Sequence, residues 1–121
     1  MIGRRGIGAR SAIVAAILCF AACAAAAPAA HASKRCKAPT YPGLGYFTSL
    51  SVTGTSCATG GKVAVAYYKC RLKHGVKGRC TSRVLGYSCT EKRNSIATEI
   101  DARVTCRSGS RRVVHTYQQN T

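Results

Sequence analysis

The sequence predicts an α+β fold in which one helix packs on a small, mostly antiparallel sheet, in the order strand, helix, strand, strand, strand. Several segments alternate apolar and polar residues, which is typical of half-buried strands, and one segment repeats apolar residues every four positions, as a helix does. An even number of cysteines in a short exported chain indicates disulfides. These observations favour a two-layer domain held together by disulfide bonds.

Residues 1–32 are predicted to be a secretory signal peptide rather than part of this fold. Three arginines form a positively charged start, an apolar, Ala-rich run follows over residues 12–27, and Ala30-His31-Ala32 has the small-x-small form of a cleavage site. The apolar run is too short for a membrane-spanning helix, which needs about 20 apolar residues. We therefore expect a secreted protein.

Lipidation is the alternative to simple secretion. The segment Phe20-Ala21-Ala22-Cys23 is close to a lipobox, in which Cys23 would be lipidated and become the mature N-terminus, although Phe fits its first position poorly. After the signal peptide, residues 33–45 are expected to form a basic arm in which Pro and Gly prevent regular structure. Residues 46–121 are expected to form a single small domain.

The predicted mature chain keeps six cysteines, which we expect to form three disulfides. A domain of this size has a marginal core, and each bridge adds roughly 2–4 kcal/mol by restricting the unfolded chain. No cofactor or metal is expected, because the sequence has no Cys-x-x-Cys pair and few histidines. Two cysteines on either side of one turn, Cys70 and Cys80, are the favoured pair. The six are Cys36, Cys57, Cys70, Cys80, Cys89 and Cys106.

The first strand of the domain is predicted over residues 46–53. Its alternation places Tyr46, Thr48, Leu50 and Val52 on one face, which we expect to be buried. A glycine directly after the segment ends the strand.

A helix is predicted over residues 57–74, after Ser56, which is a favoured N-cap residue. Apolar residues recur every four positions over 64–72, and cations near the end suit the negative pole of a helix. Part of the segment would also suit a strand. Gly60 and Gly61 disfavour the helix by about 1 kcal/mol each.

The second half of the domain is predicted to contain three strands after a basic loop. The segments are a loop at 75–82, a strand at 84–90, a polar loop at 91–95, a strand at 100–107, a turn at 108–110, a strand at 113–117 and a frayed end at 118–121. We expect Cys57, at the helix start, to bond Cys89 or Cys106 in these strands. Cys36 is expected to bond whichever of the two remains.

The charge of the predicted mature chain favours an anionic partner. Sixteen Lys and Arg residues stand against three acidic residues, a net charge of +13. An anionic cell-wall polymer or membrane surface is the expected partner, and nucleic acid, with tyrosines as stacking platforms, is a further candidate. A purely solubilising charge is the simplest alternative. The candidate anion-binding residues lie at the helix end, the basic loop and the last hairpin: Lys69, Arg71, Lys73, Lys77, Arg79, Arg83, Arg111 and Arg112.

Three short motifs resemble a group of small exported actinobacterial proteins. They are Thr53-Gly54-Thr55-Ser56-Cys57-Ala58, Gly86-Tyr87-Ser88-Cys89 and Val104-Thr105-Cys106-Arg107-Ser108-Gly109. The resemblance covers about residues 46–117, and its members are uncharacterised, so it implies no catalytic or binding residues. Cys70 and Cys80 are an addition to the shorter pattern, which implies that they pair with each other.

The sequence contains few residues that are candidates for catalysis. A ribonuclease would need an acid and a base, for which His74 and His115 are the candidates, but no local motif surrounds them. Glu91, Glu99 and Asp101 are too few for a glycosidase and are expected to pair with nearby cations. A cationic antimicrobial or toxin-like protein and a protease inhibitor are further alternatives. We expect a secreted, non-enzymatic binding module for extracellular or cell-wall anionic surfaces.

Overall fold

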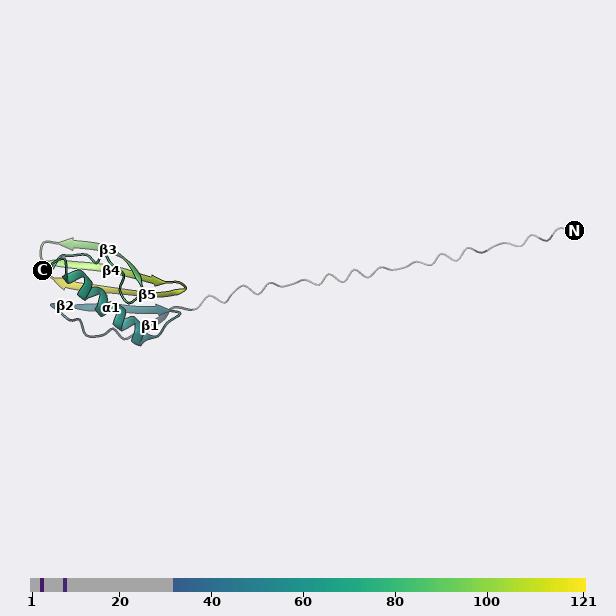
Figure 1. Cartoon of the computed structure of the whole chain (residues 1–121). Helices are drawn as coiled ribbons and strands as arrows, with labels where there is room; N and C mark the ends of the chain where they lie inside the picture. The colour runs from purple at the N-terminus through teal and green to yellow at the C-terminus, as the bar shows by residue number, and fades with distance from the viewer. Residues whose placement is uncertain (1–2, 4–7, 9–31) are drawn as a thin grey trace.

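The computed structural model of the chain describes residues 3, 8 and 32–121. Most of the predicted signal peptide, including Cys23, lies outside these residues. The remainder forms one helix on a five-stranded antiparallel sheet with the order β1-β2-β5-β4-β3, which confirms the predicted α+β class. Figure 1 shows the helix lying across the sheet. The elements are β1 (Lys34–Cys36), β2 (Gly45–Thr53), α1 (Cys57–Leu72), β3 (Ser88–Ile96), β4 (Glu99–Ser108) and β5 (Arg111–Asn120).

The start of α1 is set by the predicted cap. The Ser56 hydroxyl accepts a hydrogen bond from the Thr59 backbone N–H at 3.1 Å. The helix packs on β2 and β5, and Gly60 is the point of closest approach, because a Cβ atom there would lie 2.5 Å from Val52 Cγ1. The glycine that weakens the helix locally is therefore required by its packing on the sheet.

The two neighbouring glycines are expected to respond in opposite ways to substitution. Gly60→Ala should lower the free energy of unfolding by about 1–3 kcal/mol, because the added methyl overpacks the contact with Val52. Gly61→Ala should be neutral or stabilising by up to about 1 kcal/mol, because its Cβ would meet Pro39 Cγ at an ordinary 3.7 Å and alanine favours helix. Denaturant unfolding of the oxidised protein measures both, and equal effects would contradict this packing.

A β-bulge in β2 limits the predicted inward face to its second half, because Leu50 and Val52 are buried as predicted whereas Tyr46 and Thr48 are exposed. Pairing with β5 shifts between Phe47 and Ser49, so Thr48 is an extra residue and the alternation reverses there. Phe47 packs against the core with Leu50, whereas Tyr46 is 60% exposed. A prediction from strict alternation cannot detect this bulge, because it assumes that the two-residue period continues unbroken along the strand.

The strand predicted over 84–90 begins only at Ser88, and the loop predicted over 91–95 is wrong because those residues continue the strand. Val84 and Tyr87 exchange backbone hydrogen bonds across a tight turn in which Leu85 and Gly86 have positive φ angles of 49° and 81°. β3 then runs from Ser88 to Ile96. The sequence pattern does not indicate the later part of this strand, because its inward-facing residues Glu91 and Arg93 are charged. They can be buried because they pair with each other.

Both ends of the described region are more ordered than predicted. Within the arm of 33–45, residues 34–36 pair with β2 as β1, and Tyr41 is buried in the core. At the other end, β5 continues to Asn120 rather than fraying at 118–121, because the buried side chain of Gln119 has hydrogen-bond partners inside the fold.

The disulfides join Cys36 to Cys57, Cys70 to Cys80 and Cys89 to Cys106. The Cys70–Cys80 pair is as predicted, whereas the predicted link from Cys57 to a late strand is wrong. Cys89 and Cys106 are direct partners across β3 and β4, and the pairing of β1 with β2 brings Cys36 to the helix start. The three bridges indicate an extracellular or other oxidising environment. Within residues 32–121, no helix has the length and apolar character needed to cross a membrane.

Candidate anion-binding site

The sheet has one covered face and one open face. The segments outside the sheet contact the face that carries α1: Tyr41 bonds Gln119, and Gln119 and Arg93 bond the backbone of the loop at 76–78. Val84 and Tyr87 belong to the same core. We call the opposite side, formed by the alternate residues of each strand, the open sheet face.

The open sheet face is strongly cationic. Alternation along the strands places five basic residues on it and two carboxylates, Glu99 and Asp101. No ion pair within residues 32–121 involves any of the five, because the two ion pairs of this region are made by Arg79 and Arg93 with Glu91. The five basic residues are Arg35, Lys92, Arg103, Arg107 and Arg112.

Four of these cations form two directly opposed pairs. Lys92 of β3 stands across from Arg103 of β4, and Arg107 of β4 stands across from Arg112 of β5. Like charges placed directly opposite one another across strands destabilise a sheet. The free protein therefore carries local repulsion at two places on one uncovered face.

Three adjoining hollows cross the open sheet face, and Arg103 lines all of them. Their volumes are about 490, 430 and 80 Å³. Thr48 lines both of the larger hollows, and its hydroxyl lies 2.6 Å from the hydroxyl of Thr116. The hollows therefore combine a guanidinium group with hydroxyl groups that both donate and accept hydrogen bonds.

The composition of this face suits phosphate, carboxylate and sugar groups better than nucleic-acid bases. Four of the six tyrosines are buried in the core, and Tyr46, at the end of β2, is the exposed one. Binding of successive bases depends on several aromatic platforms, which the face lacks. Hydroxyl side chains are abundant instead: Thr48, Ser49, Ser51, Thr53, Thr90, Thr105 and Thr116.

Arg71, predicted to lie on the anion-binding surface, is instead completely buried, with 0% exposure. Its guanidinium donates to Gln119 Oε1 at 2.6 Å and to Tyr41 Oη at 3.1 Å, and its Cζ lies 4.4 Å from the centre of the Tyr117 ring. Burial raises the pKa of Tyr41 to about 12, which keeps its hydroxyl protonated and donating to Gln119 Oε1 at 2.6 Å. Arg71 is therefore a core residue that joins the helix to β5.

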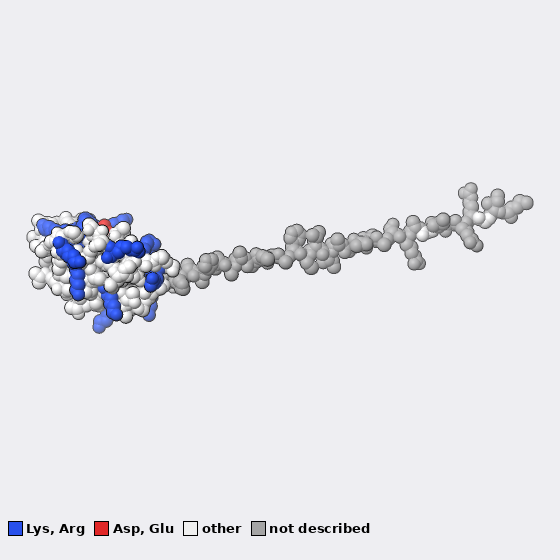
Figure 2. Space-filling view, in the orientation of Figure 1, with Lys and Arg blue, Asp and Glu red and all other residues white. Residues whose placement is uncertain are grey.

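The other predicted residues do not form one surface. Lys69, Lys73, Lys77, Arg79 and Arg83 are exposed at the helix end and the basic loop, Arg111 lies 5.8 Å over the Tyr87 ring, and Arg112 is on the open sheet face. Figure 2 shows lysine and arginine side chains spread over the visible side of the protein rather than gathered in one cluster. Of the predicted set, Arg112 alone belongs to the two opposed pairs.

The basic loop is fixed to the sheet by a buried carboxylate. Glu91 Oε2 lies 2.7 Å from Arg93 and 3.1 Å from Arg79, and the Tyr117 hydroxyl donates to the same carboxylate. Arg93 also donates to the Lys77 carbonyl at 2.7 Å. The predicted pairing of Glu91 with a nearby cation is confirmed, and its role is structural.

The two histidines do not support a ribonuclease site. His115 is 1% exposed and packs edge-on against Phe47 and Tyr67, with ring centres 5.7 and 5.6 Å away. Burial lowers the pKa of His115 to about 4. His74, in contrast, is exposed beside Thr81 in the basic loop. A buried imidazole has no access to an RNA backbone, so the pair cannot act together as acid and base.

Comparison with known proteins finds no match to a protein family, a curated protein or a solved structure. The resemblance to small exported actinobacterial proteins therefore stays a prediction. Residues 32–121 therefore form a small, disulfide-bonded α+β domain whose cationic sheet face is left uncovered by the rest of this region.

Proposed function

We propose that this protein is a secreted, non-enzymatic module that holds an anionic polymer of the cell wall on its open sheet face. The two opposed cation pairs, Lys92 with Arg103 and Arg107 with Arg112, carry the proposal. Their repulsion lowers the stability of the free protein, and negative charges bound between them would relieve it.

The shape of the face favours an extended polymer over a single small anion. Five neighbouring strands, about 4.8 Å apart, span roughly 20 Å. The cations are distributed over that width, from Arg35 on one edge strand to Lys92 on the other. The adjoining hollows and the hydroxyl groups between the cations supply hydrogen bonds to phosphate, carboxylate or sugar oxygens.

Replacement of Arg103 by threonine tests the proposal by separating binding from stability. Arg103→Thr should leave the melting temperature unchanged or raise it, because it removes a repulsive pair and threonine favours strands. Retention on purified cell wall at low salt should fall about tenfold, because the residue that lines all three hollows is lost. Co-sedimentation across a salt series and thermal unfolding give the two readouts.

Lys73→Thr is the matched control, because it removes one positive charge from the exposed helix end. Equal losses of retention in Arg103→Thr and Lys73→Thr would show that only net charge matters and would overturn the assignment of the face. The same salt series with RNA and with anionic vesicles completes the test. We expect the RNA to stay intact, and we expect the protein to bind RNA and vesicles more weakly than it binds cell wall. Equal binding to RNA, vesicles and cell wall that is lost as salt is added would contradict the proposal.

A further inference from the structure

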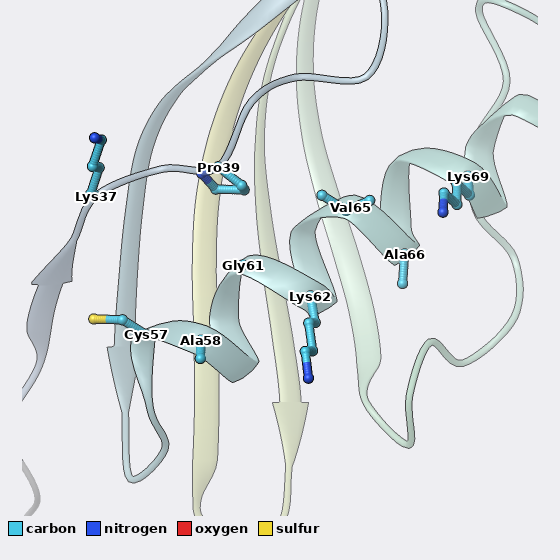
Figure 3. A pocket seen from close by; sticks show the side chains of 9 residues that line it. All are labelled: Lys37, Pro39, Cys57, Ala58, Gly61, Lys62, Val65, Ala66 and Lys69. Atoms are coloured by element: carbon cyan, nitrogen blue, oxygen red, sulfur yellow. The ribbon is translucent and has the colours of Figure 1, made fainter.

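A second surface, on the helix side, has a different chemistry. A groove of about 520 Å³ lies between the outer side of α1 and the segment that follows β1. Figure 3 shows Pro39 of that segment facing the helix near Gly61, with Lys62 and Lys69 projecting from the helix. The floor is apolar and consists of Pro39, Cys57, Ala58, Gly61, Val65 and Ala66.

The apolar floor is unusual for the solvent side of a helix. The buried stripe of α1 includes Gly60, Val63 and Tyr67. The partly buried Cys57 and Ala66 of the groove lie at its edge, and Ala58, Gly61 and Val65 lie outside this stripe. A surface helix normally carries polar residues there. Here Ala58 is exposed and Val65 is only half-buried.

The charges around the groove are all of one sign. Lys37, Lys62 and Lys69 line it, and no acidic residue does. An apolar floor with ammonium groups at its edges is complementary to a molecule that has an alkyl chain and an anionic head. We propose that this groove binds a single long-chain carboxylate amphiphile, such as a fatty acid, independently of the polymer site on the open sheet face.

The shape of the groove favours a single molecule over a bilayer surface. Helices that insert into membranes present large protruding side chains such as Trp, Phe and Leu, whereas the helix residues of this floor are small. The large apolar side chains that are exposed elsewhere, such as Leu44 and Leu85, do not line the groove. The volume is within the range of about 300–1,000 Å³ that is typical of ligand sites.

The groove is built into the covalent framework. The Cys36–Cys57 disulfide joins the end of β1 to the first residue of α1, so the segment that carries Lys37 and Pro39 is held beside the helix. Because this wall of the groove is fixed before binding, less conformational entropy of the protein is lost when a ligand binds.

Calorimetric titration of the oxidised secreted protein with monomeric dodecanoate, below its micellar concentration, tests this site. We expect saturable 1:1 binding, with at least tenfold weaker binding of dodecyltrimethylammonium, which has the same tail and the opposite charge. Lys62→Glu combined with Lys69→Glu should weaken dodecanoate binding at least tenfold. Lys73→Glu, at the same helix end but outside the groove, should change it less than twofold.

A second variant tests the apolar floor without a change of charge. Ala58→Trp, at an exposed position, should fill the groove and abolish dodecanoate binding while the melting temperature is retained. The proposal is overturned if dodecanoate shows no 1:1 binding, if Lys73→Glu weakens it as much as the groove variants do, or if the protein binds anionic vesicles but not the monomer. Loss of this site would leave cell-wall retention unchanged, which separates it from the polymer site.

Discussion

Arg71→Ala is expected to lower the free energy of unfolding by about 2–5 kcal/mol. The substitution removes a fully buried guanidinium and opens a cavity against Tyr117. The Gly78 carbonyl loses its 3.4 Å bond from Arg71 and keeps its 2.9 Å bond from Arg93. Gln119 Oε1 loses its 2.6 Å bond to the guanidinium as well. Guanidinium chloride unfolding of the oxidised protein measures the loss, which is a large part of the stability of a small domain.

Two companion variants separate charge from packing in this experiment. Lys69→Ala, two positions earlier on the exposed side of α1, should change stability by less than about 0.5 kcal/mol. Arg71→Met keeps much of the side-chain volume and should recover part of the loss, because an apolar residue can replace a buried charge at little cost. Wild-type stability in Arg71→Ala would show that the residue is not the buried link between α1 and β5.

Acid is expected to destabilise the protein through His115. Burial lowers the pKa of this imidazole in the folded state to about 4, with a smaller contribution from the positive charge of Arg71, whereas the unfolded value is near 6.5. Between these values the unfolded chain binds a proton that the folded protein excludes. Stability is therefore fully retained above about pH 6.5, falls as the pH drops, and is about 3 kcal/mol lower at pH 4.

The variant His115→Leu should flatten this dependence on pH, whatever its effect on absolute stability. Neither ring nitrogen of His115 has a hydrogen-bond partner, so the neutral imidazole behaves as an apolar core group. His74→Leu, in the exposed loop, should leave the slope between pH 4 and 6.5 as it is in the wild type. A slope that survives in His115→Leu would assign the acid sensitivity to other groups.

The parts of the fold that were predicted correctly depend on neighbours in sequence. The cap at Ser56, the alternation of residues 100–107 and the closeness of Cys70 to Cys80 are all local signals. The strand over 88–96 was predicted only in its first three residues, because its later inner residues, Glu91 and Arg93, are charged. Their burial depends on pairing with each other and with Tyr117, which only the folded sheet brings together.

Arg71 shows why the candidate site could be predicted only in part. In sequence it is one of several cations that suit a helix end, and nothing local separates it from Lys69 or Lys73. Its burial comes from Gln119, which is 48 residues away and lies on β5.

The outward polar side of β4 was visible in the alternation of 100–107. The opposition of Arg103 to Lys92, however, depends on the register with β3, and the sequence pattern did not give the bounds of that strand. The open sheet face was therefore missed although one of its strands was predicted well.

The most direct test of the cationic sheet face is a nuclear magnetic resonance titration of the oxidised, isotope-labelled protein with inorganic polyphosphate and with soluble fragments of cell wall. We expect shifts of the amides around Arg103 and Thr116, together with the side-chain resonances of Arg107 and Arg112, and little change in α1. Shifts centred instead on the helix end and the basic loop at 73–83, or spread evenly over all exposed cations, would contradict the assignment of the open sheet face as the binding surface.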